Sequence, residues 1–191
     1  MARDFTINQI SSSNAEYLPQ IRSYTLNSSL DKSILKDFKG TVYDSGGSGG
    51  NYSINEKYYF VIRSDYGVEV QLYGNISITD LNDVLRVYTA NDQSSLDSPI
   101  TLDALGNITT SGFNQVFSTN GSYSGIIGAN SIGGYVVTWY SDNSNVSSGF
   151  KLDWTINNIY TKIDQIPYNL SVPSVISLRN RSSSYKVLTS K

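Results

Sequence analysis

The sequence contains no cysteine and no histidine, and these two absences exclude large classes of function. Without cysteine the chain can form no disulfide, no thiolate metal site and no cysteine nucleophile. Without histidine it can build neither a Ser-His-Asp triad nor a zinc site with histidine ligands, and it has no imidazole general base. Because these groups serve most nucleophilic and acid–base mechanisms, we expect a protein that is not an enzyme.

The chain also lacks an excess of charge of either sign and lacks long apolar runs. The chain carries 14 Lys and Arg against 16 Asp and Glu, and the basic residues are scattered, so no basic stripe is present to follow a nucleic-acid backbone. No stretch approaches the roughly 20 apolar residues of a membrane-spanning helix. The first ten residues lack the basic and then apolar pattern of a signal peptide. We therefore expect no nucleic-acid partner, no membrane span and synthesis in the host cytoplasm.

Aromatic residues, in contrast, are abundant, with 15 Tyr, 6 Phe and 2 Trp. Aromatic and β-branched side chains pack well on a pleated sheet. Apolar and polar residues alternate with the period of two that is typical of half-buried strands, and clusters of Gly, Asn, Asp and Ser separate these segments. The alternating segments are 58–63, 68–73, 85–88, 135–140 and 150–156. We predict an all-β protein with an antiparallel jelly-roll sandwich over residues 40–156.

The segments on either side have a different character. Residues 1–39 are polar and irregular, except for a patch in which Leu30, Ile34, Leu35 and Phe38 have helical spacing. We predict an N-terminal arm with a short helix there and an extended C-terminal arm over residues 157–191. The apolar residues of both arms are the candidate assembly contacts: Leu30, Ile34, Phe38, Val172, Val175, Ile176 and Leu178.

Four short motifs follow one another in the central region. They are a Gly-Gly loop followed by Asn-Tyr within residues 40–52, the pair Phe60 and Ile62, the strand Asp83-Val-Leu-Arg-Val-Tyr88, and a turn with Ser141-Asp142 before Gly149-Phe150. In this order they resemble the CUB domain, a jelly-roll module of extracellular and surface proteins. The resemblance covers residues 40–156 and implies a binding or scaffolding module. The disulfides usual in that family are absent here.

The resemblance also implies a calcium site. Calcium-binding members of the family join a Glu to two Asp at the positions of Asp83 and Asp142. No Glu stands at the third position in this chain, where Thr79 and Asp80 are the available groups. Calcium prefers about six to eight oxygen ligands, so Asp83 and Asp142 with backbone carbonyls predict a weak calcium site and no required cofactor. The alternative is that both aspartates cap turns.

Two further features have competing interpretations. The glycine-rich segment 46–50 lacks the Gly-Lys-Ser/Thr ending of a phosphate-binding loop and is expected to form a turn. The strand tyrosines are candidates for a surface that binds sugar or protein, because tyrosine offers a large contact area with a polar tip. The alternative is that they cover the second face of a sheet. The candidates are Tyr66, Tyr73, Tyr88 and Tyr140.

Taken together, these features predict a non-enzymatic structural subunit of a large assembly, in which terminal arms bind other structural proteins and copies of the same chain. The expected setting is a bacteriophage virion, as a capsid decoration, neck, or tail and baseplate component. The alternative is a carbohydrate- or receptor-binding, adhesin-like module on a virion or cell surface, with a host surface glycan as its ligand. Discriminating evidence must come from the arms and from the exposed tyrosines.

Overall fold

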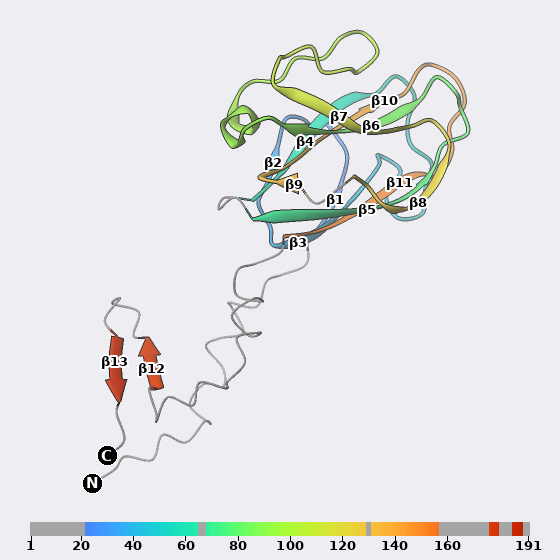
Figure 1. Cartoon of the computed structure of the whole chain (residues 1–191). Helices are drawn as coiled ribbons and strands as arrows, with labels where there is room; N and C mark the ends of the chain where they lie inside the picture. Colours follow the sequence, from blue (N-terminus) through green and yellow to red (C-terminus); the bar gives the residue numbers. More distant parts are fainter. Residues whose placement is uncertain (1–21, 65–67, 129–130, 157–175, 180–184, 189–191) are drawn as a thin grey trace. The chain divides into compact units, whose positions relative to one another are not determined.

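A computed structural model of the chain describes residues 22–64, 68–128, 131–156, 176–179 and 185–188. They belong to two units, one within residues 1–158 and the other within residues 159–191. The first is a sandwich of two β-sheets (Figure 1), which confirms the predicted all-β fold. Within the described ranges the only helical element is the 3₁₀ turn η3 (Gln93–Asp97), and no helix there has the length and apolar character needed to cross a membrane.

The two sheets are built from strands far apart in the sequence. The first sheet has the order β1 (Arg22–Thr25), β3 (Lys39–Tyr43), β11 (Gly149–Ile156), β5 (Glu69–Ser77) and β8 (Ser122–Ile126), and the short β9 (Ser131–Ile132) also pairs with β5. The second sheet has the order β2 (Ile34–Leu35), β4 (Lys57–Arg63), β10 (Gly134–Tyr140), β6 (Val84–Ala90) and β7 (Phe113–Thr119). Pairs β1–β3 and β2–β4 are parallel, and the other pairs are antiparallel.

The sequence periodicity explains which face of each strand is buried. In β5 every second residue from Val70 to Ile76 is buried, and the residues between them are exposed. Strand β10 is buried on both faces, because it is the central strand of the second sheet and a smaller apolar cluster covers the outer face. That cluster comprises Tyr59, Val61, Tyr88, Leu96, Ile100 and Val136. The second sheet is therefore covered on both sides, whereas the first has one open face.

Aromatic residues pack together with aliphatic ones in the main core between the sheets. The Trp139 ring on β10 contacts the Phe150 ring edge-on at a centroid distance of 5.4 Å and the Tyr52 ring edge-on at 4.9 Å. Trp154 on β11 lies over Gly40 on β3, where an added Cβ would come within 2.2 Å of the indole ring. Large aromatic side chains bury much apolar area each, so these few rings contribute a large share of the core beside the Leu, Ile and Val side chains.

The helix predicted between Leu30 and Phe38 is wrong. Ile34 and Leu35 form β2 instead, which pairs with Val61 and Ile62 on β4. Leu30 and Leu35 are buried in the main core, so their spacing reflects packing between two sheets and not a helical face. Leu30 is thereby unavailable as an assembly contact. The sandwich also includes Arg22–Thr25, so it begins earlier than the expected boundary at residue 40.

The second unit contains a β-hairpin. Strand β12 (Ile176–Arg179) pairs antiparallel with β13 (Tyr185–Leu188), and together they form a sheet of two strands. Within the described part of the chain, these strands pair with no other strand. The hairpin lies in the segment where sequence analysis predicted an extended arm.

Candidate functional site

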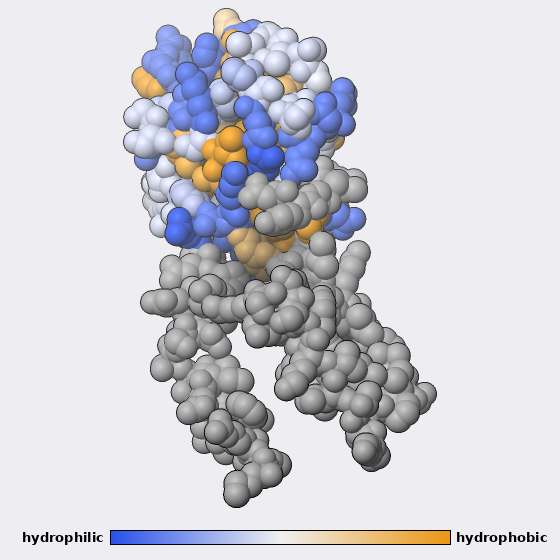
Figure 2. Space-filling view, turned by 90° about the vertical axis from the view of Figure 1, so that its left-hand side faces the viewer, coloured by the Kyte–Doolittle hydropathy of each residue, from blue (hydrophilic) through white to orange (hydrophobic). Residues whose placement is uncertain are grey.

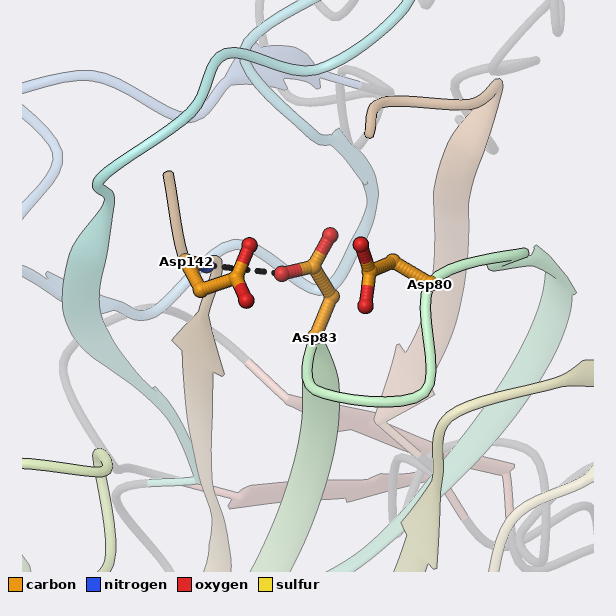
Figure 3. A group of neighbouring side chains, drawn as sticks. All are labelled: Asp80, Asp83 and Asp142. Atoms are coloured by element: carbon orange, nitrogen blue, oxygen red, sulfur yellow. Dashed lines mark hydrogen bonds between the residues drawn. The ribbon is translucent and has the colours of Figure 1, made fainter. Parts of the chain in front are cut away.

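Three aspartates from two loops meet at one end of the sandwich. Asp83 directly precedes β6, and Asp142 follows the end of β10. Because β6 and β10 are antiparallel, with Val84 opposite Tyr140, the start of one strand lies beside the end of the other. Asp80 comes from the same loop as Asp83, and the Asp83 amide donates a hydrogen bond to the Asp80 carbonyl at 3.3 Å. Figure 3 shows the three carboxylates directed toward one another.

The geometry of this aspartate cluster suits a divalent cation. One carboxylate oxygen from each of Asp80, Asp83 and Asp142 lies within 4.8 Å of the other two. Calcium–oxygen distances are about 2.3–2.6 Å, so oxygens on opposite sides of one ion are about 5 Å apart. Asp80 supplies the third carboxylate that the sequence-based site lacked. Sequence analysis named Asp80 only as an available group, because the turn that directs its side chain inward leaves no periodic signal.

Asp83 is the most buried member of the cluster. One of its oxygens accepts a hydrogen bond from the Tyr52 hydroxyl at 2.6 Å, and the other accepts one from the Asp142 amide at 2.7 Å. Burial raises the pKa of Asp83, these hydrogen bonds lower it, and the neighbouring charges of Asp80 and Asp142 raise it. Burial and the bond to Asp83 raise the pKa of Tyr52, so that its hydroxyl stays protonated and donates.

Asp80 and Asp142 are held by neutral donors. The Asn82 amide donates to Asp80 at 2.9 Å, and the Asn82 side chain donates to Asp142 at 3.0 Å. The Ser144 hydroxyl lies 2.7 Å from an oxygen of Asp80 and 2.6 Å from one of Asp142, although its single proton can serve only one of them at a time. The bonds from Asn82 and Ser144 lower the pKa of Asp80. Hydrogen bonds from neutral groups therefore fix the positions of these carboxylates, and no positive charge in the described part of the chain compensates them.

Two consequences follow for the interpretations made from the sequence. Among the described residues, none of the three carboxylates forms an ion pair with a Lys or Arg. The cluster therefore concentrates negative charge. The turn-capping alternative also has its expected contacts, since Asp80 accepts from the Asn82 amide and Asp142 from the Ser144 amide. The two interpretations are compatible, because each carboxylate has more than one acceptor site.

Two further buried acids, which sequence analysis missed, fix the neighbouring loop 44–56. Asp44 accepts from the amides of Gly46 and Phe150, both at 2.7 Å, and Glu56 accepts from the Trp139 indole at 2.9 Å. Burial raises the pKa of both carboxyl groups. An added Cβ on Gly149 would lie 2.2 Å from the Asp44 carboxylate. The motif Gly149-Phe150 therefore marks a place where the backbone passes close to a buried acid.

The candidate tyrosines do not form one surface. Tyr73 is 43% exposed on β5, and Tyr140 is half-buried at the end of β10. Tyr88 is buried in the cluster that covers the second sheet, so it cannot serve as a surface contact. For Tyr88 the alternative interpretation holds, since it covers the second face of a sheet. Tyr66 lies outside the described residues.

The remaining candidate assembly contacts are in different environments. Ile34 is exposed on the edge strand β2, whereas Phe38 is partly buried against the main core. Ile176 and Leu178 belong to β12. Val172 and Val175 lie outside the described residues.

Comparison with known proteins finds no family model and no curated protein that matches this chain.

Proposed function

We propose that this protein is a non-enzymatic structural subunit of a large assembly, with the sandwich as its rigid body and its terminal regions as contacts. The hairpin β12–β13 is the observation that carries the proposal. An isolated two-stranded sheet is at best marginally stable in water, and among the described residues these strands pair only with each other. Each strand thus has an edge whose amide and carbonyl groups suit strand addition by a partner.

The setting that fits this arrangement is a bacteriophage virion, where the chain would be a capsid decoration, neck, or tail and baseplate component. A jelly-roll body of the CUB type is part of this proposal. What supports it is the position of the motif residues: Asp83 to Tyr88 lead into and along β6, and the Ser141-Asp142 turn lies between β10 and β11. On the side drawn in Figure 2, apolar residues form small patches among hydrophilic ones. That surface suits a body exposed to solvent more than a broad apolar interface.

Self-association of the full chain tests the assembly proposal. Sedimentation velocity should show oligomers that grow with protein concentration, and Ser177→Pro should reduce them, because proline removes a backbone donor from β12. Ser177→Ala is the matched control and should associate as the unchanged chain does. A chain that remains monomeric at every concentration, or one that associates equally with proline at position 177, would contradict contact through the hairpin.

A second proposal concerns the aspartate cluster, which we infer to bind calcium and so to stabilise the loop end of the sandwich. Asp80, Asp83 and Asp142 would hold the ion, and backbone carbonyls and water would complete its coordination. The supporting observation is the convergence of three carboxylate oxygens within 4.8 Å without a basic partner. A bound cation would offset the repulsion among them and link the loop that precedes β6 to the loop that follows β10.

Isothermal titration of the chelated protein with calcium chloride tests this second proposal. We expect one binding event, which Asp80→Asn weakens strongly, because the amide keeps the size of the side chain and loses its charge. Asp92→Asn is the matched control, since Asp92 caps η3 away from the cluster. Absence of calcium binding, or equal affinity in the Asp80→Asn protein, would leave the cluster with turn capping alone.

A further inference from the structure

The outer face of the first sheet is open to solvent. On β5 the residues that point outward are exposed from Glu69 to Asn75, and on β11 their counterparts Lys151, Asp153 and Thr155 are partly exposed. The second sheet differs, because the cluster around Tyr88 covers its outer face. Within the described part of the sandwich, the outward side chains of β5, β8 and β11 are therefore accessible to solvent, and these strands lie side by side in the first sheet (Figure 1).

Strand register aligns these side chains in rows across the sheet. Asp153 on β11 lies opposite Thr41 on β3 and opposite Tyr73 on β5, and Tyr73 lies opposite Ile126 on β8. Neighbouring strands are about 4.8 Å apart, so this row extends about 14 Å over four strands. In the next row, Lys151 lies between Tyr43 and Asn75. The two rows form an elongated strip of mostly polar groups, with one tyrosine in each row, Tyr73 in the first and Tyr43 in the second.

Tyr73 lies at the centre of this strip. Its hydroxyl is 2.9 Å from the hydroxyl of Ser124. Ser124 is on β8 and belongs to the neighbouring row, where it is opposite Asn75. To reach it, the Tyr73 side chain must lean along the surface toward β8, because an upright side chain would carry the hydroxyl away from the sheet. With 43% of the residue exposed, the ring offers an apolar surface to a ligand that lies along the sheet.

The polar groups beside Tyr73 are paired with each other and are fixed in place. The Lys151 ammonium lies 2.9 Å from one Asp153 oxygen, and the Thr41 hydroxyl donates to the other oxygen at 2.5 Å. The charges of Lys151 and Asp153 cancel within the strip, which gives no attraction for a polyanion such as nucleic acid. Both residues keep further donor and acceptor capacity, because an ammonium has three protons and a carboxylate about four acceptor sites.

We propose that this face binds a neutral linear oligosaccharide, with Tyr73 as the stacking platform and Lys151, Asp153 and Asn75 as hydrogen-bonding groups. A sugar ring combines an apolar face of C–H groups with hydroxyls that both donate and accept, which matches an aromatic ring surrounded by groups of both kinds. A stable protein interface would require a larger apolar centre than Tyr73 and Ile126 provide. The proposal is independent of calcium binding and of self-association.

Two-dimensional amide NMR of the full chain in chelator tests the proposal, with maltohexaose, cellohexaose and chitohexaose as neutral probes and a heparin hexasaccharide as the charged comparison. At least one neutral probe should shift amide signals of β5 and β11 in a saturable manner. Loss of the Tyr73 ring should weaken that binding by roughly tenfold, the size expected for one aromatic contact. Tyr73→Ala is the test variant, and Asn75→Ala should weaken binding less and without loss of fold.

Matched variants distinguish this face from other surfaces. Tyr73→Phe keeps the ring and should retain most of the affinity, whereas Tyr140→Ala alters the second sheet and should leave the affinity unchanged. The proposal is overturned by the absence of shifts with all three neutral probes, by binding of heparin alone, or by Tyr140→Ala weakening binding as much as Tyr73→Ala. Shifts that remain unchanged in the Tyr73→Ala protein overturn it as well.

Discussion

The hydrogen bond from Tyr52 to Asp83 provides the sharpest test of the charge arrangement at the loop end. Tyr52→Phe removes only the hydroxyl that donates to Asp83 at 2.6 Å. The ring remains, so its edge contact with Trp139 at 4.9 Å is kept and no large cavity forms. The variant therefore isolates the loss of one donor to a carboxylate that is almost completely buried.

The expected cost follows from the nature of this bond. A hydrogen bond to a charged group contributes about 1.5–3 kcal/mol, and the acceptor left behind stays buried with one donor fewer. For a chain of this size, 1 kcal/mol changes Tm by about 2–4 °C. We thus expect Tyr52→Phe to lower Tm by about 3–12 °C at pH 7 in chelator. Thermal melting followed by fluorescence of the buried Trp139 and Trp154 measures this change.

The pH dependence of that loss identifies its cause. Tyr52 stabilises the ionised form of Asp83, so the variant raises the pKa of Asp83 further above its ordinary value. The loss should then be largest at neutral pH and shrink as the pH falls through the raised pKa, where the carboxyl group becomes neutral in both proteins. Tyr140→Phe is the control, since this half-buried tyrosine ends β10 and substitutions at such sites change stability little.

A double-mutant cycle with Asp83→Asn completes the test. If the hydroxyl acts through the carboxylate charge, Tyr52→Phe should cost less in the Asp83→Asn background, and the two substitutions should be coupled by about 0.5–3 kcal/mol. Equal melting temperatures of the Tyr52→Phe and unchanged proteins at pH 7 would refute the reasoning. So would a loss of the same size at neutral pH and below the pKa of Asp83.

Three further predictions concern the fold and the site. Gly149→Ala should destabilise the sandwich by more than about 1 kcal/mol in urea titration, because Gly149 has a φ of 68° and its Cβ would meet Asp44; a stability equal to that of the unchanged protein would contradict this. Leu152→Ala should cost about 2–5 kcal/mol and Leu81→Ala less than about 0.5 kcal/mol in the same titration, since only Leu152 is buried. Calcium at a hundredfold excess over Kd should add about 2.7 kcal/mol to the stability, and an unchanged Tm would contradict calcium binding.

The strands were predictable from the sequence because their burial is periodic. Residues 150–156 alternate in the way that a half-buried strand requires, and they form β11. Residues 135–140 form the predicted strand β10, but this strand is buried on both faces and not on one. The helix predicted from Leu30 to Phe38 was wrong because two strands and a turn can place apolar residues at helical spacing over a short distance. Such a patch contains too few residues for its period to distinguish the two structures.

The site was predictable only in part. Asp83 and Asp142 were found from motif positions, but the contribution of Asp80 depends on the turn in which Asn82 and Ser144 hold its carboxylate. The bond from the Asn82 amide is local, but the bond from Ser144 joins residues 64 positions apart, and no local sequence pattern indicates it. Likewise, nothing in the alternation of β6 shows that the loop after it covers Tyr88. Tertiary covering of a sheet face is not encoded in the period of the strand beneath it.

The burial of several acids at one end of the sandwich makes its stability depend on pH. Burial raises the pKa of Asp44, Glu56 and Asp83, so each binds a proton more tightly in the folded than in the unfolded chain. The stabilisation that they contribute when protonated is lost as the pH rises through these raised pKa values, whereas Asp80, with its lowered pKa, contributes in the opposite direction. A cation bound to the cluster would favour the ionised form of Asp83 and reverse its contribution. The dependence of stability on pH, measured with calcium and with chelator, therefore reports whether the cluster holds an ion.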